Sequence, residues 1–440
     1  MAERAVLAGW GRAPSSAADL VRPTSAAALA ATMGNNGERG LIARGLGRSY
    51  GDAAQSAGGT VVVTTGAGAI DELDTETGLL RAEAGASIEA IHTLSVPTGW
   101  FLPVVPGTRF VTLGGAIAAD IHGKNHHGAG SFGNHVRSIR LALGTGEVVD
   151  VGPDRDGPLF WATLGGMGMT GIVVSAEVQL TPITSSELAV ESTPTSDLDA
   201  TMTALLSADA THPYTVAWVD ATARAARLGR GIVEAGRFCD HGGELAYAPR
   251  RPVAAPPLPS GLVGSSGRLL NRAWYRLGAV GTGSGRRSIG SFFHPLDGVG
   301  GWNRMYGTGG LVQWQMVVPL GAEALVAGCL GAFASTGAPA VLAVLKRFGP
   351  TGSGHLSFPL EGWTLAVDLA ASDPAVAALL DDLDKRVVDA GGRIYLAKDS
   401  RVDPELIPDM YPRLAEWQEI RHRADPDGRL RSDLSRRLGL

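Results

Sequence analysis

Residues 102–136, LPVVPGTRFVTLGGAIAADIHGKNHHGAGSFGNHV, form the stretch in which glycine and polar residues are most densely interleaved. Glycine has no Cβ, so the backbone around it can approach a ligand closely and expose consecutive N–H groups. The density of glycines here therefore predicts a loop that can hold a ligand closely.

A second glycine-rich stretch, ARGLGRSYGD, runs from Ala43 to Asp52. Its glycines and the fixed cationic fork of arginine suit a pyrophosphate. A simple turn between two strands would use similar residues, because glycine is common in turns. Taken alone, this stretch leaves both interpretations open.

Length and composition bound the class of protein. A chain of 440 residues is too long for one ordinary core, so we expect two domains. The net charge of -5 and the lack of a long basic stripe argue against nucleic acid as the main partner. No apolar run is long enough to cross a bilayer, and we find no charged-then-apolar leader. We expect a cytoplasmic or peripherally membrane-associated protein at the cell envelope, with the periplasmic side left open.

The expected elements alternate between short strands and helices. Glycine-bounded apolar runs predict strands at 59–66 and 78–86, and Ser87 is predicted to cap a helix that stops before Pro97. A hairpin is predicted at 137–152 and a long strand at 171–183. From about residue 185, scattered strands and helices predict a separate α+β sheet domain. Cys239 and Cys329 fit no metal or redox spacing, and we expect both to be buried.

The stretch 102–136, together with GGMGMTGI at 165–172, resembles the flavin-binding fold of the vanillyl-alcohol oxidase and para-cresol methylhydroxylase superfamily. In that superfamily ARGLGRSYGD occupies the place of the first pyrophosphate loop, which favours flavin binding over a simple turn. The resemblance implies a two-domain α+β flavoprotein with FAD as its cofactor. It places an FAD-binding domain at 1–184, an antiparallel-sheet substrate domain at 185–391 with a mobile loop at about 248–290, and a segment at 392–440 that returns to the FAD domain.

Later motifs, among them FFHPLD, WNRMYG, LVQWQMVVP, LKRFGP and YLAKDSR, extend the resemblance along nearly the whole chain to the decaprenylphosphoryl-β-D-ribose 2′-oxidase family. This resemblance implies oxidation of the ribose 2′-hydroxyl of a polyprenyl-phosphate-linked ribose to the 2′-keto intermediate. That step is the first half of an epimerisation that makes the arabinose donor for cell-wall arabinan. It also implies an NADH-dependent short-chain reductase as partner and a peripheral contact with membrane lipid.

Two loops are expected to hold the FAD pyrophosphate through backbone N–H groups. The expected N–H donors are Gly45, Leu46, Gly47, Arg48 and Ser49 in the first loop and Gly107, Thr108, Thr112, Gly114 and Gly115 in the second. Arg44, Tyr50 and Pro106 are further expected members of the cofactor site. The resemblance adds Ala118, Ile121, His122, Gly123, Asn125, Ile172, Tyr395 and Ala397 to the cofactor site. Many relatives attach the flavin through a histidine where this chain has Arg48, so we predict FAD bound without a covalent bond.

Hydride transfer from a ribose carbon needs a group beside the flavin that orients the hydroxyl as it loses its proton. The resemblance places Lys398 at the substrate and His122 near the reactive ring, and Tyr50 is the third catalytic candidate. If 395–398 were an extended strand, Tyr395 and Lys398 would face opposite sides, so both can line one surface only if the chain bends.

Substrate contacts are expected from the second domain. Gln313 and Gln315 alternate in VQWQM, so both amides should face one side, where they suit sugar hydroxyls. Lys346 interrupts an apolar run and suits the substrate phosphate. The resemblance adds Trp218, Arg304, Thr364, Ala366 and Lys398 to the substrate site.

Two local patterns limit these expectations. His122, His126 and His127 suggest a metal site, but the glycines around them argue against a continuous helix and no carboxylate or cysteine completes a ligand set, so we predict no metal. Mycobacterial relatives carry a cysteine at the position of Ala366, where nitro-aromatic inhibitors are captured, and relatives often carry asparagine at the position of Thr364. Catalysis here is therefore expected to need no thiol.

Two other functions compete with the first. An FAD-dependent alditol or aldonolactone oxidase would act on a free sugar and usually carries the attachment histidine, so Arg48 and Lys346 weigh against it. A flavin-retaining binding or scaffold subunit would not need the catalytic candidates Lys398 and His122.

Overall fold

The computed structural model describes residues 3–34, 38–240, 245–255, 271–276, 278, 283–335, 340 and 342–440. Much of the loop predicted at about 248–290 lies outside these residues. Within them, β15 (Val253–Ala254) pairs with β17 (Val299–Gly300), and β16 (Gly283–Ser288) is the edge strand of a large sheet. The end of the predicted loop is thus a paired strand, because its backbone hydrogen-bonds to β12.

Two sheets form the N-terminal half. The first has the order β1 (Glu3–Ala8), β2 (Ser15–Val21), β4 (Thr60–Val63) and β3 (Leu41–Arg44). The second has the order β5 (Ile70–Leu73), β6 (Leu79–Glu83), β10 (Ile172–Gln179), β8 (Val136–Ala142) and β9 (Val148–Val151). A short pair joins β7 (Trp100–Phe101) to β11 (Thr181–Pro182). The predicted strands and the hairpin between β8 and β9 are confirmed.

Short helices connect these strands. They are α1 (Ala26–Ala31), α2 (Ile88–Ser95), α3 (Leu113–Ala118), α4 (His126–Ala129) and α5 (Gly157–Thr163). As predicted, Ser87 caps α2: its hydroxyl accepts a hydrogen bond from the backbone nitrogen of Ala90 at 3.1 Å. The helix ends at Ser95, two residues before Pro97.

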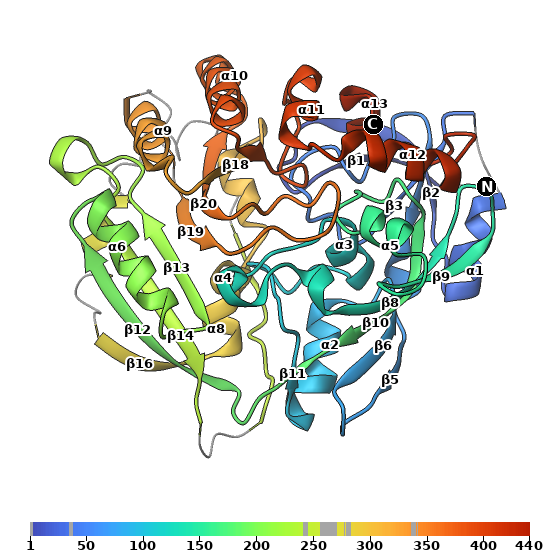
Figure 1. Ribbon diagram of the computed structural model, residues 1–440, viewed down its shortest axis with the longest axis horizontal. Helices are drawn as coiled ribbons and strands as arrows, with labels where there is room; N and C mark the ends of the chain where they lie inside the picture. The colour runs from blue at the N-terminus through green and yellow to red at the C-terminus, as the bar shows by residue number, and fades with distance from the viewer. Residues whose placement is uncertain are drawn as a thin grey trace.

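An eight-stranded antiparallel sheet forms the second half. Its order is β16, β12 (Glu187–Thr195), β14 (Gly231–Phe238), β13 (Tyr214–Val219), β19 (Ala343–Phe348), β20 (Gly362–Ala370), β18 (Leu311–Pro319) and β21 (Arg393–Ile394). The helices α6 (Leu198–Asp209), α8 (Ile289–Phe293), α9 (Glu323–Ser335) and α10 (Pro374–Asp389) accompany it. Figure 1 shows this sheet on the left, with α6, α9 and α10 beside it.

Side-chain alternation decides which face of the large sheet meets the helices. The Trp314 indole of β18 donates from Nε1 to Asp384 of α10 at 2.7 Å and contacts Phe333 of α9 at 5.5 Å between ring centroids. Because successive side chains of a strand point to opposite faces, Gln313 and Gln315 lie on the other face. The predicted common orientation of the two glutamines is confirmed.

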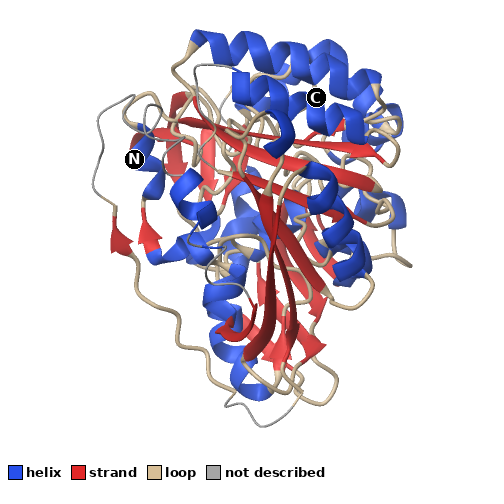
Figure 2. Ribbon diagram, turned by 90° about the vertical axis from the view of Figure 1, so that its left-hand side faces the viewer, coloured by secondary structure: helices blue, strands red, loops and turns tan. Residues whose placement is uncertain are grey.

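The last part of the chain packs back onto the first half. It contains α11 (Ile407–Met410), α12 (Leu414–Ala424) and α13 (Asp433–Leu438). Trp417 of α12 donates from its indole nitrogen to the carbonyl of Ala162 in α5 at 3.0 Å, and Leu430 bridges to Leu41 of β3. Figure 1 shows these red helices beside β1 and β2, and Figure 2 shows helices around the strands from the side.

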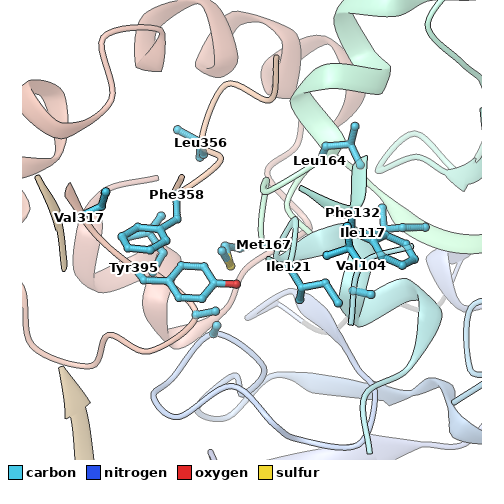
Figure 3. Close-up of a cluster of buried hydrophobic side chains, with 14 of the residues drawn as sticks. Val104, Ile117, Ile121, Phe132, Leu164, Met167, Val317, Leu356, Phe358 and Tyr395 are labelled. Atoms are coloured by element: carbon cyan, nitrogen blue, oxygen red, sulfur yellow. The ribbon is translucent and has the colours of Figure 1, made fainter. Parts of the chain in front are cut away.

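One buried apolar cluster joins the two halves. Figure 3 shows Ile121 and Met167 of the first half next to Phe358 and Tyr395 of the second. The Phe358 and Tyr395 rings stack with centroids 4.6 Å apart. The halves therefore share a core along the surface where the glycine loops lie.

Two further observations concern the sequence-based expectations. Cys329 is buried as predicted, but Cys239 is only half-buried because it follows the last residue of β14 at the sheet end. Among the described helices, none combines the length and apolar character that crossing a bilayer requires.

Candidate active site

The first glycine loop follows β3 directly. The backbone N–H groups of residues 45–49 have no hydrogen-bond partner among the described residues. A Cβ built on Gly45 would lie 2.1 Å from Thr112 Oγ1, so only glycine lets this loop approach the second one. The first loop thus offers a run of free backbone donors beside the second loop, as an anion-binding loop requires.

The second loop offers fewer donors than predicted. The Gly114 nitrogen donates to the carbonyl of Ala84 at 2.8 Å, and the Gly115 nitrogen donates to the hydroxyl of Thr112 at 3.2 Å. These bonds anchor and cap α3, so the expected donation of both N–H groups to the pyrophosphate is corrected. Gly107 faces open space and, with Thr108, keeps an unused N–H group among the described residues.

The two arginines of the first loop differ in their surroundings. The Arg44 guanidinium donates to the carbonyls of Ala54 and Ala8 at 3.0 and 2.7 Å, so this side chain anchors the loop rather than extending from it as a free cation. The Arg48 guanidinium lies 3.9 Å from the Trp10 ring centroid, and its buried Nε has no partner among the described residues. Arg48 therefore remains a cation available to a bound phosphate or ring.

Tyr395 and Lys398 reach the same region because the chain turns. The strand β21 ends at Ile394, and the Lys398 nitrogen donates to the carbonyl of Tyr395 at 2.9 Å. The extended conformation considered for 395–398 is thus replaced by a turn, which supplies the bend that the two side chains need. The Tyr395 hydroxyl donates to the carbonyl of Ala119 at the end of α3, at 3.1 Å.

Tyr50 and Lys398 form one unit. The Tyr50 nitrogen donates to the carbonyl of Ala397 at 2.9 Å, and Lys398 Nζ lies 3.9 Å from the Tyr50 ring centroid. Gly51 makes this junction possible, because a Cβ there would lie 1.7 Å from the carbonyl oxygen of Asp399. Burial raises the pKa of Tyr50 well above its usual value, so its phenol is neutral.

The imidazole of His122 is neutral, and one of its two ring nitrogens is hydrogen-bonded within the described residues. Burial, reinforced by the charge of Lys346, lowers the pKa of His122 well below its usual value. The Gln315 amide nitrogen lies 3.0 Å from His122 Nε2 and 3.2 Å from the hydroxyl of Thr364. Because an amide nitrogen only donates, the imidazole proton resides on Nδ1. That buried Nδ1 has no partner within the described part of the chain.

The register of the large sheet brings most predicted substrate residues onto one face. Gln313 lies opposite Asp368, Gln315 opposite Ala366, Lys346 opposite Thr364, and Trp218 opposite Val344. Directly opposed residues point to the same face of a sheet. The face therefore carries Trp218, Gln313, Gln315, Lys346, Thr364 and Ala366 together.

Lys346 has no carboxylate within ion-pair distance among the described residues. Burial, together with the charges of Lys124 and Lys398, lowers its pKa to about 7. Arg304 lies elsewhere, exposed on the turn Trp302–Tyr306, and the sheet register does not bring it to this face. Its proposed contact with substrate has no support from the sheet geometry.

The other residues expected at the cofactor surround α3 and the second loop. Asn125 donates to the carbonyl of Pro103 at 2.7 Å and leaves its buried Oδ1 without a partner in the described chain. Ile172 is buried at the start of β10, opposite Ala142. The remaining members are Pro106, Ala118, Ile121, Gly123 and Ala397, and their contacts with FAD stay predictions.

Asp368 was missed by the sequence analysis. It lies on the same face as Thr364 and Ala366, is 1% exposed, and accepts a hydrogen bond from Gln313 Nε2 at 2.6 Å. The signal was present in TLAVD, since the alternation that placed Gln313 and Gln315 together applies equally to this strand.

The three histidines of HGKNHH have separate partners. His126 accepts from the Gly349 nitrogen at 3.2 Å, whereas His127 contacts Asp209 at 3.5 Å. The helix α4 begins only at His126, so His122 is not on it. No group of three or more candidate metal ligands occurs in the described ranges.

Comparison with known proteins gives consistent matches. Residues 17–152 match the FAD binding domain family. The chain is 40% identical to the decaprenylphosphoryl-β-D-ribose oxidase of Mycolicibacterium smegmatis, over 99% of this chain and 97% of that protein. It is also 40% identical to an uncharacterised protein of the mprA 5′ region of Streptomyces coelicolor, over 80% of this chain and 100% of that protein.

A more distant match is the human Δ(24)-sterol reductase, 30% identical over 25% of this chain and 22% of that protein. The free donors of the first loop, Arg48 and the unpartnered atoms of His122 and Asn125 fit the cofactor that the matched domain binds. The cofactor of the chain is FAD.

Proposed function

Since the chain belongs to the decaprenylphosphoryl-β-D-ribose oxidase family and is an FAD-dependent oxidoreductase, we propose that it oxidises the ribose 2′-hydroxyl of a polyprenyl-phosphate-linked ribose to a ketone. The observation that carries the proposal is the sheet face on which two amides and an unpaired lysine lie beside His122. Amides bind sugar hydroxyls, and the unpaired cation binds the phosphate.

The cofactor site is built by the first loop. We assign residues 45–49 and Arg48 to the FAD pyrophosphate, and Tyr395 and His122 to the region of its ring. A bound FAD would supply the hydride acceptor for the ribose carbon. The absence of a histidine at position 48 supports non-covalent binding.

We assign Lys398 to contact the reacting hydroxyl. The amine of Lys398 packs against the ring of Tyr50. Gln315 fixes the tautomer of His122, so the Nδ1 proton can be donated to a neighbouring acceptor. Gln313 and Thr364 contribute further polar groups from the sheet. Each role follows from the contacts and the burial of its residue, so a single substitution can test it.

The proposed reaction implies a partner enzyme and a contact with a membrane. The 2′-keto product requires a reductase to complete an epimerisation, and we assign that step to a separate NADH-dependent short-chain reductase. The polyprenyl tail of the substrate is apolar, so the protein must meet a membrane or a lipid carrier to take it up. We propose peripheral contact with the membrane at the cell envelope.

Anaerobic mixing of the FAD-loaded protein with substrate tests the function. Farnesylphosphoryl-ribose is expected to bleach the flavin absorption, whereas free ribose and an aldonolactone at equal concentration are not. Bleaching by the free sugar or the lactone without the phosphoryl compound would contradict the proposal. If none of the three bleaches a flavin that dithionite still reduces, the chain is a binding subunit instead.

A further inference from the structure

Asp368 places a carboxylate inside the substrate face. Its side chain is 1% exposed, and Gln313 Nε2 donates to Oδ1 at 2.6 Å. The other oxygen, Oδ2, is buried and has no partner among the described residues. A buried carboxylate with an unused oxygen is costly unless a cation or donor compensates it.

The groups that face Asp368 are few. Lys398 approaches from the turn, Tyr50 from the first loop, Tyr306 from the end of η7 (Trp302–Tyr306), and Gln313 from the neighbouring strand. Lys398 is the only cation in this set, and Asp368 is the carboxylate that acts on Lys398. Burial lowers the pKa of Lys398, whereas the charge of Asp368 raises it. The two groups make no direct ion pair. They lie around Tyr50, whose ring centroid is 3.9 Å from Lys398 Nζ, and the unpartnered Oδ2 of Asp368 is buried in the same region.

We propose that Asp368 is a positioning residue whose buried carboxylate faces the amine of Lys398 and supports this amine as the acceptor of the 2′-hydroxyl proton. The inference rests on the proposed function and names the base of that reaction. The C2′ hydrogen leaves with two electrons as a hydride to FAD, the hydroxyl proton passes to the neutral amine of Lys398, and a C2′=O double bond forms. The resulting ammonium is stabilised by the Asp368 carboxylate until the proton returns to solvent.

His122 suits this role less well. Its Nε2 already accepts the hydrogen bond from Gln315, and its remaining nitrogen carries the proton and can only donate. Tyr50 is a neutral phenol, which is an acid rather than a base. Lys398 is thus the buried site group that changes protonation near neutral pH with a counter-charge beside it.

The first test measures Lys398 directly and needs no substrate. The chain has four lysines, Lys124, Lys346, Lys385 and Lys398, which peptide mass spectrometry can follow separately. FAD-loaded protein is labelled briefly with acetic anhydride across a pH series. In Asp368→Asn, the pH of half-maximal labelling of Lys398 should fall by about one unit, because a nearby negative charge is lost. The labelling pH of the exposed Lys385 should not move, whereas Lys346 is not a control because the charge of Lys398 acts on it.

The second test is the pH dependence of flavin reduction by substrate. Turnover requires the neutral amine, so the rate rises with pH through the pKa of Lys398. Asp368→Asn should lower the plateau rate by about tenfold, since a weaker base accepts the proton more slowly, and should shift the rising limb to lower pH. KM should stay within about threefold, because the asparagine oxygen still accepts from Gln313. Asp368→Glu should restore part of the rate and the position of the limb.

Asp220→Asn is the matched control. Asp220 is also 1% exposed, but its carboxylate accepts from Arg230 and Thr222 just past the end of β13 and is not a group that acts on Lys398. It should leave both the labelling of Lys398 and the rising limb unchanged.

Two results would overturn the inference. One is a labelling pH of Lys398 that is the same in Asp368→Asn and the parent. The other is a lower rate of flavin reduction in Asp368→Asn without a shift of the rising limb of the pH profile. A merely structural role of Asp368 would produce that result. If the parent protein is not reduced by the phosphoryl-ribose, the proposed function fails, whereas the labelling result still decides the coupling of the two residues.

Discussion

Lys346 illustrates how one buried side chain can set a pH dependence. Its pKa is lowered to about 7, so its charge is lost as the pH rises through the neutral range. A phosphodiester keeps its negative charge throughout this range and is bound by the charged lysine. In the parent protein kcat/KM should therefore fall by about tenfold per pH unit above neutrality, once the rising limb of Lys398 has levelled off.

Two substitutions isolate this effect. Lys346→Arg should remove the decline, because arginine stays charged. Lys346→Gln should lower kcat/KM by about 10- to 100-fold at pH 6.5 and make it independent of this titration. Stopped-flow flavin reduction over a pH series measures both, and a decline that persists in Lys346→Arg would assign the titration to another group.

Ala366 in β20 is half-buried, whereas its neighbours on the strand are buried. It lies opposite Gln315 and faces the site. A thiol installed by Ala366→Cys should react with an electrophile formed when the reduced flavin converts a nitro-aromatic compound. Intact-mass spectrometry after turnover should show an adduct on the variant and none on the parent, whose Cys329 is buried and whose half-buried Cys239 lies just past the end of β14. An adduct on the parent, or none on the variant, would show that Ala366 does not face the reactive ring.

At the scale of elements, α13 fixes the loop of Tyr50 to the turn of Lys398. Arg437 donates to both oxygens of Asp52 at 2.9 and 3.0 Å and to Asp399 Oδ2 at 2.8 Å. Those carboxylate side chains are 4% and 1% exposed, and Arg437 pairs with both, while Asp399 Oδ1 also accepts from the backbone nitrogens of Arg401 and Val402. Asp52 and Asp399 are sequence neighbours of the catalytic candidates, which makes α13 part of the support of the site.

Arg437→Ala should destabilise the fold by about 2–4 kcal/mol at pH 8, below the full cost of breaking a buried pair because Arg437 is partly exposed. Burial already raises the pKa of Asp52 above its ordinary value and Arg437 opposes this rise, so removing the cation raises the pKa of Asp52 further. Protonation then favours folding, so the deficit should shrink as the pH falls from 8 to 5.

Thermal unfolding at both pH values measures this loss, and kcat should fall with it. Arg429→Ala is the control, since within the described part of the chain that side chain pairs with the exposed Asp427 alone. Equal losses of melting temperature in the two variants would remove the special role of Arg437.

At the scale of the molecule, FAD should behave as a separable part of the fold. The site has Arg48 where a covalent attachment would need histidine. Acid precipitation should therefore leave the yellow colour in the supernatant, and colour retained in the pellet would contradict non-covalent binding. Free FAD at about 100 times its Kd should add about 2.7 kcal/mol to the stability of the apoprotein, readable as a higher Tm.

The sequence could predict those parts of the molecule that are governed by local rules. The Ser87 cap, the hairpin at 137–152 and the common face of Gln313 and Gln315 depend on neighbouring residues, and all were predicted. Asp368 follows from the same alternation and was overlooked. The turn at Lys398 could not be predicted, because it is held by the Tyr50 nitrogen and the close approach of Gly51, which are distant in sequence.

The contact between Arg437 and Asp52 spans 385 residues, which has a consequence for biosynthesis. A ribosome that has made the first glycine loop must add 385 more residues before the guanidinium that neutralises Asp52 exists. During that interval the loop and the Lys398 turn cannot be joined in their final arrangement. We therefore expect the nascent chain to bind FAD tightly only after α13 has left the exit tunnel. Before that point the FAD site is incomplete and open to solvent.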